Sequence, residues 1–109
     1  DMFDCIIPTH NGRNGQIFTK NGIMNMRNER WKNDFSPLDE NGTSFVDSLY
    51  SKAYLRHLFN TKEILGMQIA SVHNLAFYLQ LMHEAREHII AGDFSIWKND
   101  TIENVMRRL

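Results

Sequence analysis

The feature that most constrains this fold is a long series of apolar residues, spaced three and four apart, between Gly66 and Gly92. This spacing places apolar side chains on one face of an α-helix. Glycine commonly ends a helix by adopting the left-handed conformation, and Gly92 stands where that end is expected. The pattern predicts one long helix that packs its inner face against a sheet or barrel wall. The inner positions are Val72, Leu75, Ala76, Leu79, Met82, Ala85 and Ile89.

Shorter helices are predicted on both sides of the long one. Apolar residues recur at helical spacing from Val46 to Leu58, and Ser44 followed by Asp47 is typical of a capping box at a helix start. A short helix is expected around 62–65, because Asn60 and Gly66 interrupt the pattern. Two last helical segments are predicted over 93–97 and 100–109.

The first part of the chain predicts extended structure. The apolar residues Phe3, Cys5, Ile6 and Ile7 indicate a short buried strand that Pro8 closes, since proline removes a ladder donor. Residues 9–15 contain two glycines and two asparagines, which predict a loop. Residues 16–19 and 23–27 flank an Asn-Gly pair, the strongest short signal of a β-hairpin.

Composition limits the class of protein. A chain of 109 residues with 42% hydrophobic and 23% charged residues suits one globular domain, and a net charge of −1 provides no overall attraction to RNA. Cys5 is the only cysteine, which excludes an internal disulfide and a cage of several cysteines around a metal. No apolar stretch approaches the ~20 residues of a membrane span. We expect a cytoplasmic protein.

Asp4 is the main candidate for chemistry. It is a carboxylate within the apolar run, an expensive position for a charge unless it is paired or used. One interpretation is a nucleophile that attacks an anomeric carbon and holds the sugar covalently. The other is a buried aspartate whose oxygens accept hydrogen bonds from backbone donors. Asp1 is expected to support the end of the same strand.

Two further features each allow two interpretations. The mixture of basic and aromatic residues over 28–44 indicates either RNA contact or surface charges around a packed Trp31. Tyr50, Tyr54 and His57 lie along one stripe of the predicted helix over 46–58. That stripe is either core packing or a subunit interface, where aromatic residues with polar tips are enriched.

Several ordered blocks closely resemble bacterial-type tRNA-guanine transglycosylases, also called queuine tRNA-ribosyltransferases. The first block, residues 1–9 with the sequence DMFDCIIPT, is similar to the family's nucleophile segment. Together the blocks span nearly the whole chain. They are 1–9, 11–15, 23–28, 34–39, 50–58 and 73–78.

The resemblance implies a fold. Such enzymes are (β/α)8 TIM barrels, and this chain matches the C-terminal part of one, so we expect a mostly helical α+β fragment with one short strand and a β-hairpin. Residues 1–15 correspond to the nucleophile strand and the RNA-recognition loop, and 16–45 to the hairpin and a connection. Residues 46–109 correspond to the helical part. The chain starts within a strand motif, so we expect a segment of a longer enzyme.

The resemblance also implies an activity. The family exchanges guanine at the anticodon wobble position of tRNA for a 7-deazaguanine, either 7-aminomethyl-7-deazaguanine or queuine. Asp4 stands at the position of the covalent nucleophile, and family members form homodimers through an aromatic cluster that corresponds to Tyr50, Tyr54 and His57. The RNA-contacting stretch corresponds to Thr9, His10, Asn11, Gly12 and Arg13.

We expect this chain alone to be inactive, because the family's second catalytic aspartate belongs to an earlier part of the barrel. The alternative to a catalytic role is a non-catalytic module that binds tRNA or pairs subunits.

The sequence departs from the family at its zinc site. Members usually carry three cysteines and one histidine as ligands, and the aligned positions here are Gly42, Ser44, Asp47 and His73. Glycine supplies no ligand and serine is a poor one. We therefore expect no zinc and no other cofactor, with the capping role of Ser44 and Asp47 as the physical substitute.

Overall fold

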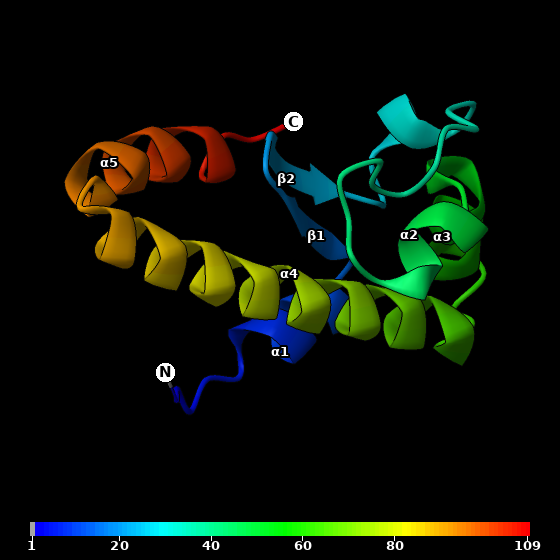
Figure 1. The fold of residues 1–109 in the computed structure, drawn as a ribbon. Helices are drawn as coiled ribbons and strands as arrows, with labels where there is room; N and C mark the ends of the chain where they lie inside the picture. The colour runs from blue at the N-terminus through cyan, green and yellow to red at the C-terminus, as the bar shows by residue number, and fades with distance from the viewer. Residues whose placement is uncertain (1) are drawn as a thin grey trace.

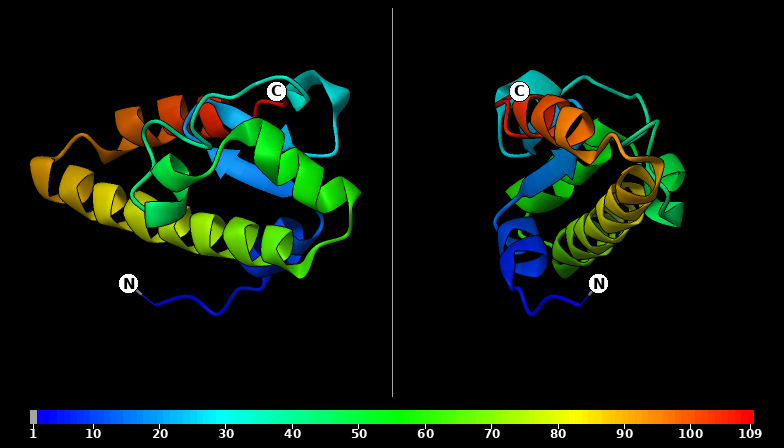
Figure 2. Two further views of the ribbon diagram at one scale, coloured as in Figure 1. Left: turned by 90° about the vertical axis from the view of Figure 1, so that its right-hand side faces the viewer. Right: turned by 60° about the vertical axis from the view of Figure 1, so that its left-hand side comes forward.

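One helix supports the whole structure, a computed structural model that describes residues 2–109. Helix α4 (Ile64–Ala91) is 28 residues long and extends along the full length of the molecule. Helix α1 lies on one side of it, and the hairpin, α2, α3 and α5 lie on the other (Figures 1 and 2). The remaining elements are α1 (Ile7–Arg13), β1 (Gln16–Thr19), β2 (Gly22–Asn25), the 3-10 helix η1 (Glu29–Trp31), α2 (Phe45–Leu49), α3 (Lys52–Asn60) and α5 (Phe94–Val105).

The predicted hairpin is confirmed. Strands β1 and β2 pair antiparallel, with Ile17 opposite Met24. The other edge of β2 receives the C-terminal residues: the Ile23 N–H donates to the Arg107 carbonyl at 2.7 Å, and the Leu109 N–H donates to the Ile23 carbonyl at 3.0 Å. The hairpin is therefore held between the body of the protein and its own C-terminal end.

The predicted buried strand over 3–7 is wrong in this structure. Residues 2–6 form no helix or strand, and Phe3 and Ile6 are 72% and 71% exposed. Within residues 2–109 the named strands pair with each other, and β2 also with Arg108, but none pairs with residues 3–7, so this segment has no ladder of hydrogen bonds. Asp1, which was assigned to the same strand, lies outside the described residues.

The predicted loop over 9–15 is also wrong for most of its length. Helix α1 starts at Ile7, places Pro8 in its first turn and continues to Arg13. Proline is favoured at a helix start, because its fixed φ suits the helix and its missing N–H would have no partner there. The same proline that suggested the end of a strand therefore begins a helix.

The single helix predicted over 46–58 is divided into α2 and α3. The capping box is confirmed, with the Ser44 side chain and the Asp47 carboxylate both in place. The helix stops because the Tyr50 carbonyl accepts a hydrogen bond from the Leu38 N–H at 2.9 Å. Ser51 then caps α3 by accepting from the Tyr54 N–H at 3.1 Å.

The long helix is confirmed, but it starts earlier than predicted, and its predicted inner face is wrong in this structure, because Leu75, Leu79 and Ile89 are 46%, 72% and 61% exposed. It continues through Gly66, so the separate helix over 62–65 does not form. A Cβ at Gly66 would lie 3.1 Å from Leu58 Cβ, so the glycine lets α3 and α4 approach closely. Gly92 ends α4 with φ of 85°, as predicted. Helix α5 is continuous and replaces the two last segments that were predicted.

The core lies between the first half of α4, the hairpin and α3. Its buried residues are Ile17, Met24, Met26, Trp31, Leu38, Val46, Leu55, Leu58, Phe59, Ile69 and Ala70. The predicted fold class, a mostly helical α+β fragment with a hairpin, is confirmed at this level. Among residues 2–109, none of the helices has the length and apolar content that crossing a membrane requires.

Candidate functional site

Asp4 lies in the exposed segment that precedes α1. Its neighbours Phe3 and Cys5 line an apolar groove of about 330 Å³ against α4, together with Pro8, Leu75, Tyr78, Leu79 and Met82. Asp4 does not line this groove and is open to solvent. Of the two interpretations of Asp4, the buried aspartate therefore does not describe this structure. The carboxylate is accessible to a large substrate.

The five predicted RNA-contacting residues lie on α1 and do not share one face. His10 and Arg13 are exposed, whereas Gly12 is buried against α4. A Cβ at Gly12 would lie 3.1 Å from the Ala70 backbone, so a side chain here would crowd α4 and the glycine permits the close approach. Thr9 and Asn11 are half-buried. The helix thus presents His10 and Arg13 outward while Gly12 positions it.

Asn74, which the sequence analysis did not single out, connects α1 and the hairpin to α4. Its side chain is fully buried. Its Oδ1 accepts from the Phe18 N–H at 3.1 Å, and its Nδ2 donates to the carbonyls of Pro8 and Gln16 at 3.0 and 2.9 Å. The available signal was two adjacent polar residues, His73 and Asn74, between the apolar Val72 and Leu75.

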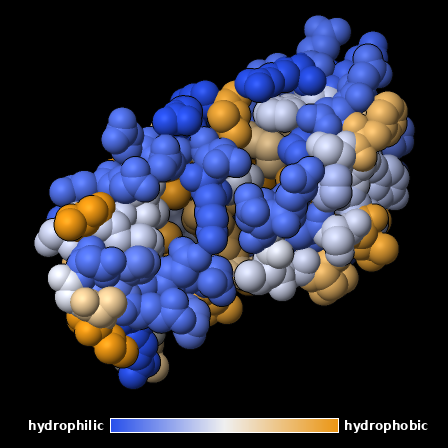
Figure 3. All heavy atoms as spheres, turned by 45° about the horizontal axis from the view of Figure 1, so that its top comes forward, coloured by the Kyte–Doolittle hydropathy of each residue, from blue (hydrophilic) through white to orange (hydrophobic). Residues whose placement is uncertain are grey.

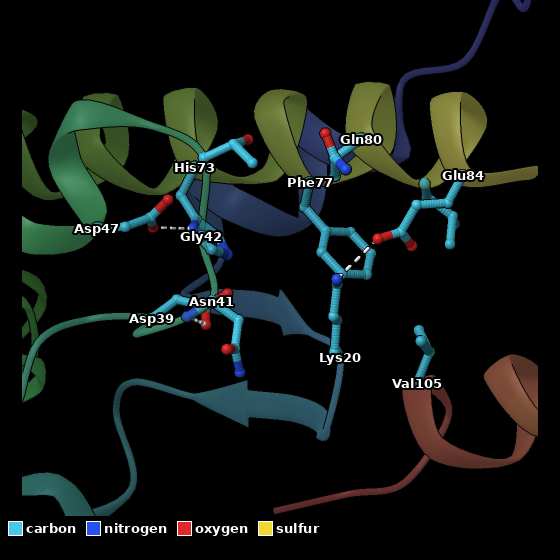
Figure 4. A pocket seen from close by; sticks show the side chains of 12 residues that line it. Lys20, Asp39, Asn41, Gly42, Asp47, His73, Phe77, Gln80, Glu84 and Val105 are labelled. Atoms are coloured by element: carbon cyan, nitrogen blue, oxygen red, sulfur yellow. Dashed lines mark hydrogen bonds and ion pairs between the residues drawn. The ribbon is translucent and has the colours of Figure 1, made fainter. Parts of the chain in front are cut away.

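His73, the residue before Asn74, connects α4 to α2 and to β1. Its Nδ1 is hydrogen-bonded to Asp47 Oδ1 (Figure 4). Its Nε2 donates to the Phe18 carbonyl at 2.7 Å. Both side chains are almost completely buried. Burial alone would lower the His73 pKa, but the hydrogen bond and charge of Asp47, helped by the Phe18 carbonyl and Asp39, raise the pKa above its usual value. The contact with Asp47 therefore favours the charged form of His73.

The four positions that align with the family's zinc ligands come together around this pair. The Ser44 N–H donates to Asp47 Oδ2 at 3.0 Å, and a Cβ built on Gly42 would fall inside the Asp47 carboxylate. Burial raises the pKa of the nearby Asp39, whose Oδ1 accepts from the Asn41 N–H. Asp39, Gly42, Asp47 and His73 all line one small cavity of about 20 Å³, together with Lys20 and Glu84 (Figure 4).

These residues do not fit a zinc ion. A ligating imidazole needs one free lone pair, and both nitrogens of His73 are occupied by hydrogen-bond acceptors. Both oxygens of Asp47 are likewise engaged, one by His73 and one by the Ser44 N–H. In the part of the chain from residue 2 to 109, no three His, Cys, Asp or Glu side chains are placed to hold a metal ion.

The predicted aromatic stripe is continuous. The rings of Tyr50 and Tyr54 stack at 5.7 Å between centroids, and Tyr54 and His57 stack at 6.5 Å. Tyr54 is 41% exposed, and the neighbouring Phe45 and Leu49 are 69% and 64% exposed. Tyr54 and His57 are therefore on the surface, whereas Tyr50 is half-buried and packs against the core.

The connection over 28–44 fits the second of its two interpretations, surface charges around a packed Trp31, and the RNA contact stays a prediction. Trp31 is buried, and the Arg30 guanidinium lies 4.8 Å from the centre of its ring. Phe35 is 76% exposed. The Arg56 Nε donates to the Asn28 carbonyl at 3.1 Å, which ties the connection to α3. Basic side chains therefore surround a packed tryptophan at the surface.

Known proteins of one family match this chain over nearly its whole length. The family described as queuine tRNA-ribosyltransferase matches residues 1–107. The queuine tRNA-ribosyltransferase of Francisella tularensis subsp. novicida is 43% identical over 104 residues, which cover 95% of this chain and 28% of that protein. Those of Clostridium acetobutylicum and Aquifex aeolicus are 46% and 42% identical, covering 94% and 100% of this chain and 27% and 29% of those proteins.

The chain belongs to the queuine tRNA-ribosyltransferase family. It spans between 27% and 29% of the length of these three curated relatives. The resemblance recognised from the ordered sequence blocks is thereby confirmed at the level of the family.

Proposed function

We propose that this chain is the part of a tRNA-guanine transglycosylase that supplies the nucleophile Asp4 and an RNA-contacting helix. The observation that carries the proposal is family membership across a motif in which Asp4 has the nucleophile's position, directly before α1. The exposure of Asp4 supports it, because a tRNA must reach the carboxylate. The substrate and the single cysteine favour a cytoplasmic location.

In the proposed reaction, an Asp4 carboxylate oxygen attacks C1′ of the wobble nucleotide. The bond from C1′ to guanine N9 breaks, and guanine leaves with the bonding electrons while an ester joins the ribose to Asp4. A 7-deazaguanine, 7-aminomethyl-7-deazaguanine or queuine, then attacks C1′ through its ring nitrogen and loses that nitrogen's proton. The carboxylate is released, and two displacements retain the anomeric configuration.

The RNA contact is proposed for the outward face of α1. Arg13 presents a guanidinium that suits a phosphate or a base edge, and His10 offers a ring that can stack or donate. Thr9 and Asn11 flank these residues, and Gly12 with Asn74 fixes the helix on α4. Extruding the target base from the anticodon stack would bring C1′ to Asp4.

The test is trapping of the covalent intermediate in the full-length protein. With a guanine-containing anticodon stem-loop and no incoming base, the wild type should form a complex that survives denaturing electrophoresis, and Asp4→Asn should form none. Glu103→Gln changes an exposed carboxylate on α5 and should trap as well as the wild type. A covalent complex with Asp4→Asn at the wild-type level would contradict the nucleophile assignment.

A role in subunit pairing is the second candidate, and the continuous stack of Tyr50, Tyr54 and His57, in which Tyr54 and His57 are exposed, favours it. We propose that this stripe pairs two copies of the protein. The mass in solution of the full-length protein should halve with Tyr54→Ala and remain unchanged with Phe35→Ala, which removes an exposed aromatic ring elsewhere. A Tyr54→Ala protein with unchanged mass would exclude the stripe as the interface.

A further inference from the structure

The loop before α2, strand β1 and helix α4 meet at one buried pair of opposite charges. We propose that the Asp47–His73 pair is a metal-free clasp that performs the structural task of a zinc ion by tying these three elements together. The clasp consists of the Asp47 carboxylate, the His73 imidazole and the Phe18 carbonyl.

The contacts of the clasp join distant parts of the chain. Asp47 belongs to the first turn of α2 and also accepts from the Ser44 N–H, which fixes the start of that helix. His73 belongs to α4, and its second nitrogen reaches β1 at Phe18. A bound metal links remote segments in the same way, by taking one ligand from each.

The pair satisfies its own polar groups, which is the condition for a buried ion pair to stabilise a fold. Each nitrogen of His73 and each oxygen of Asp47 has a partner. Removing one member would leave a buried charge without compensation, which is strongly destabilising. These partners leave no lone pair on the His73 nitrogens for a metal, so His73 cannot serve the clasp and a metal at the same time.

Gly42 shows that the loop is shaped around the carboxylate. The Asp47 side chain fills the volume that a Cβ at position 42 would need. Gly42 does not adopt a positive φ, so its backbone tolerates a side chain and the constraint is steric alone. An aspartate at 47 therefore requires the absence of a side chain at 42, and the two positions are coupled.

A double-mutant cycle tests the coupling in the full-length protein. Gly42→Ala should lower the melting temperature by several degrees, because the added methyl group displaces the Asp47 carboxylate from His73. Asp47→Ala should lower it as well. In the Asp47→Ala background, Gly42→Ala should cause a clearly smaller further loss, because the carboxylate is gone and only the Cβ of residue 47, at 2.7 Å, still meets the added methyl group. Additive losses would contradict the clasp.

Metal binding provides an independent test. The wild type should contain no zinc by elemental analysis, and a strong chelator should not change its melting temperature. The triple variant Gly42→Cys, Ser44→Cys and Asp47→Cys, which retains His73, should bind one zinc per chain and become sensitive to the chelator. The matched control adds His73→Gln to the triple variant and should lose most of the zinc.

The outcomes are decisive in both directions. One tightly bound zinc in the wild type, or a lower melting temperature on chelation, would overturn the clasp. A triple variant that folds but binds no zinc would show that this place is not equivalent to a metal position, which also overturns the proposal. If the triple variant does not fold, the double-mutant cycle still decides. None of these measurements depends on Asp4 or on activity, so failure here would leave the proposed function intact.

Discussion

The two halves of α4 are stabilised in different ways. All of its buried residues lie in the first half, and they are Gly66, Ile69, Ala70, His73 and Asn74. The second half carries no buried residue, and neither does α5, which packs against it. One continuous helix is therefore a core element at one end and a surface element at the other.

The inner half is fixed by buried polar contacts to remote segments. The outer half makes only half-exposed or exposed ones, such as the ion pair of Glu84 with Lys20 at 2.7 Å, and contacts with neighbours in sequence. Around the Gly92 cap, His88 contacts Asp93 at 2.8 Å and stacks on Trp97 at 5.1 Å. Ile89, Ile90 and Ile96 remain 61%, 80% and 77% exposed. Figure 3 shows apolar side chains at this left-hand end of the molecule, among hydrophilic ones. Helix length alone therefore does not measure how strongly a segment is tied to the fold.

The largest expected effect is at Asn74. Asn74→Leu leaves the Phe18 N–H and the Pro8 and Gln16 carbonyls without their partner. Each buried unsatisfied group costs about 1–3 kcal/mol, so the free energy of unfolding of the full-length protein should fall by at least about 3 kcal/mol.

Denaturant unfolding measures this change. The matched control is His83→Leu, in the outer half, where the side chain is exposed and the expected change is within about 0.5 kcal/mol. Equal losses in the two variants would remove the distinction between the halves of α4.

A pair of isoleucines sharpens the same contrast. Ile69 is 2% exposed and Ile90 is 80% exposed. Ile69→Ala should destabilise by about 2–5 kcal/mol, because it removes buried methyl groups and leaves a cavity. Ile90→Ala should change stability by less than about 0.5 kcal/mol. Melting curves of both variants provide the comparison, and a large loss with Ile90→Ala would show that the outer half is covered in the full-length protein.

A smaller effect is expected from a change in pH, because deprotonation of His73 removes only the charge-dependent part of its contact with Asp47. The pKa of His73 is raised in the folded state, chiefly by Asp47 and also by Asp39, against the opposing effect of burial. The stabilisation from the charged imidazole is then complete below the unfolded pKa of about 6.5 and is lost as pH rises through the folded pKa. Stability should fall as pH increases above about 6.5.

The His73→Gln variant provides the comparison for this pH dependence. It should be less stable overall and should lose the part of the slope that His73 contributes. Ile69→Val weakens the same half of α4 without removing a charge and should retain the slope. Denaturant midpoints measured across this pH range decide between the two, and a slope unchanged by His73→Gln would contradict the charged state of His73.

Local chemistry predicted much of the fold. The Asn-Gly turn, the capping box at Ser44 and Asp47, and the end of α4 at Gly92 each depend on a few consecutive residues, and all three are confirmed. The family was also recognisable, because its motifs are short stretches of sequence that follow one another in a fixed order along the chain. The candidate site was predicted only as a set of positions: Asp4 and the residues of α1 keep their predicted roles as proposals.

Errors occurred where remote contacts decide the backbone. The apolar run before Pro8 resembles a strand, but a strand needs a neighbour, and none of the described residues provides one. The pattern from 46 to 58 is helical throughout, yet a hydrogen bond from Leu38 to Tyr50 divides it. Gly66 resembles an interruption and instead allows α3 to pack closely on α4.

By itself the sequence determined the hairpin, the helix ends and the family, because each depends on residue types at short spacing. Only the tertiary structure decided what polar residues inside α4 do. The partners of Asn74 and His73 lie far away in the sequence, so the helical pattern does not reveal them. In the fold these partners include Phe18, Pro8 and Asp47. Their hydrogen bonds stabilise the fold because they are made away from water, and burial is a property of the whole fold.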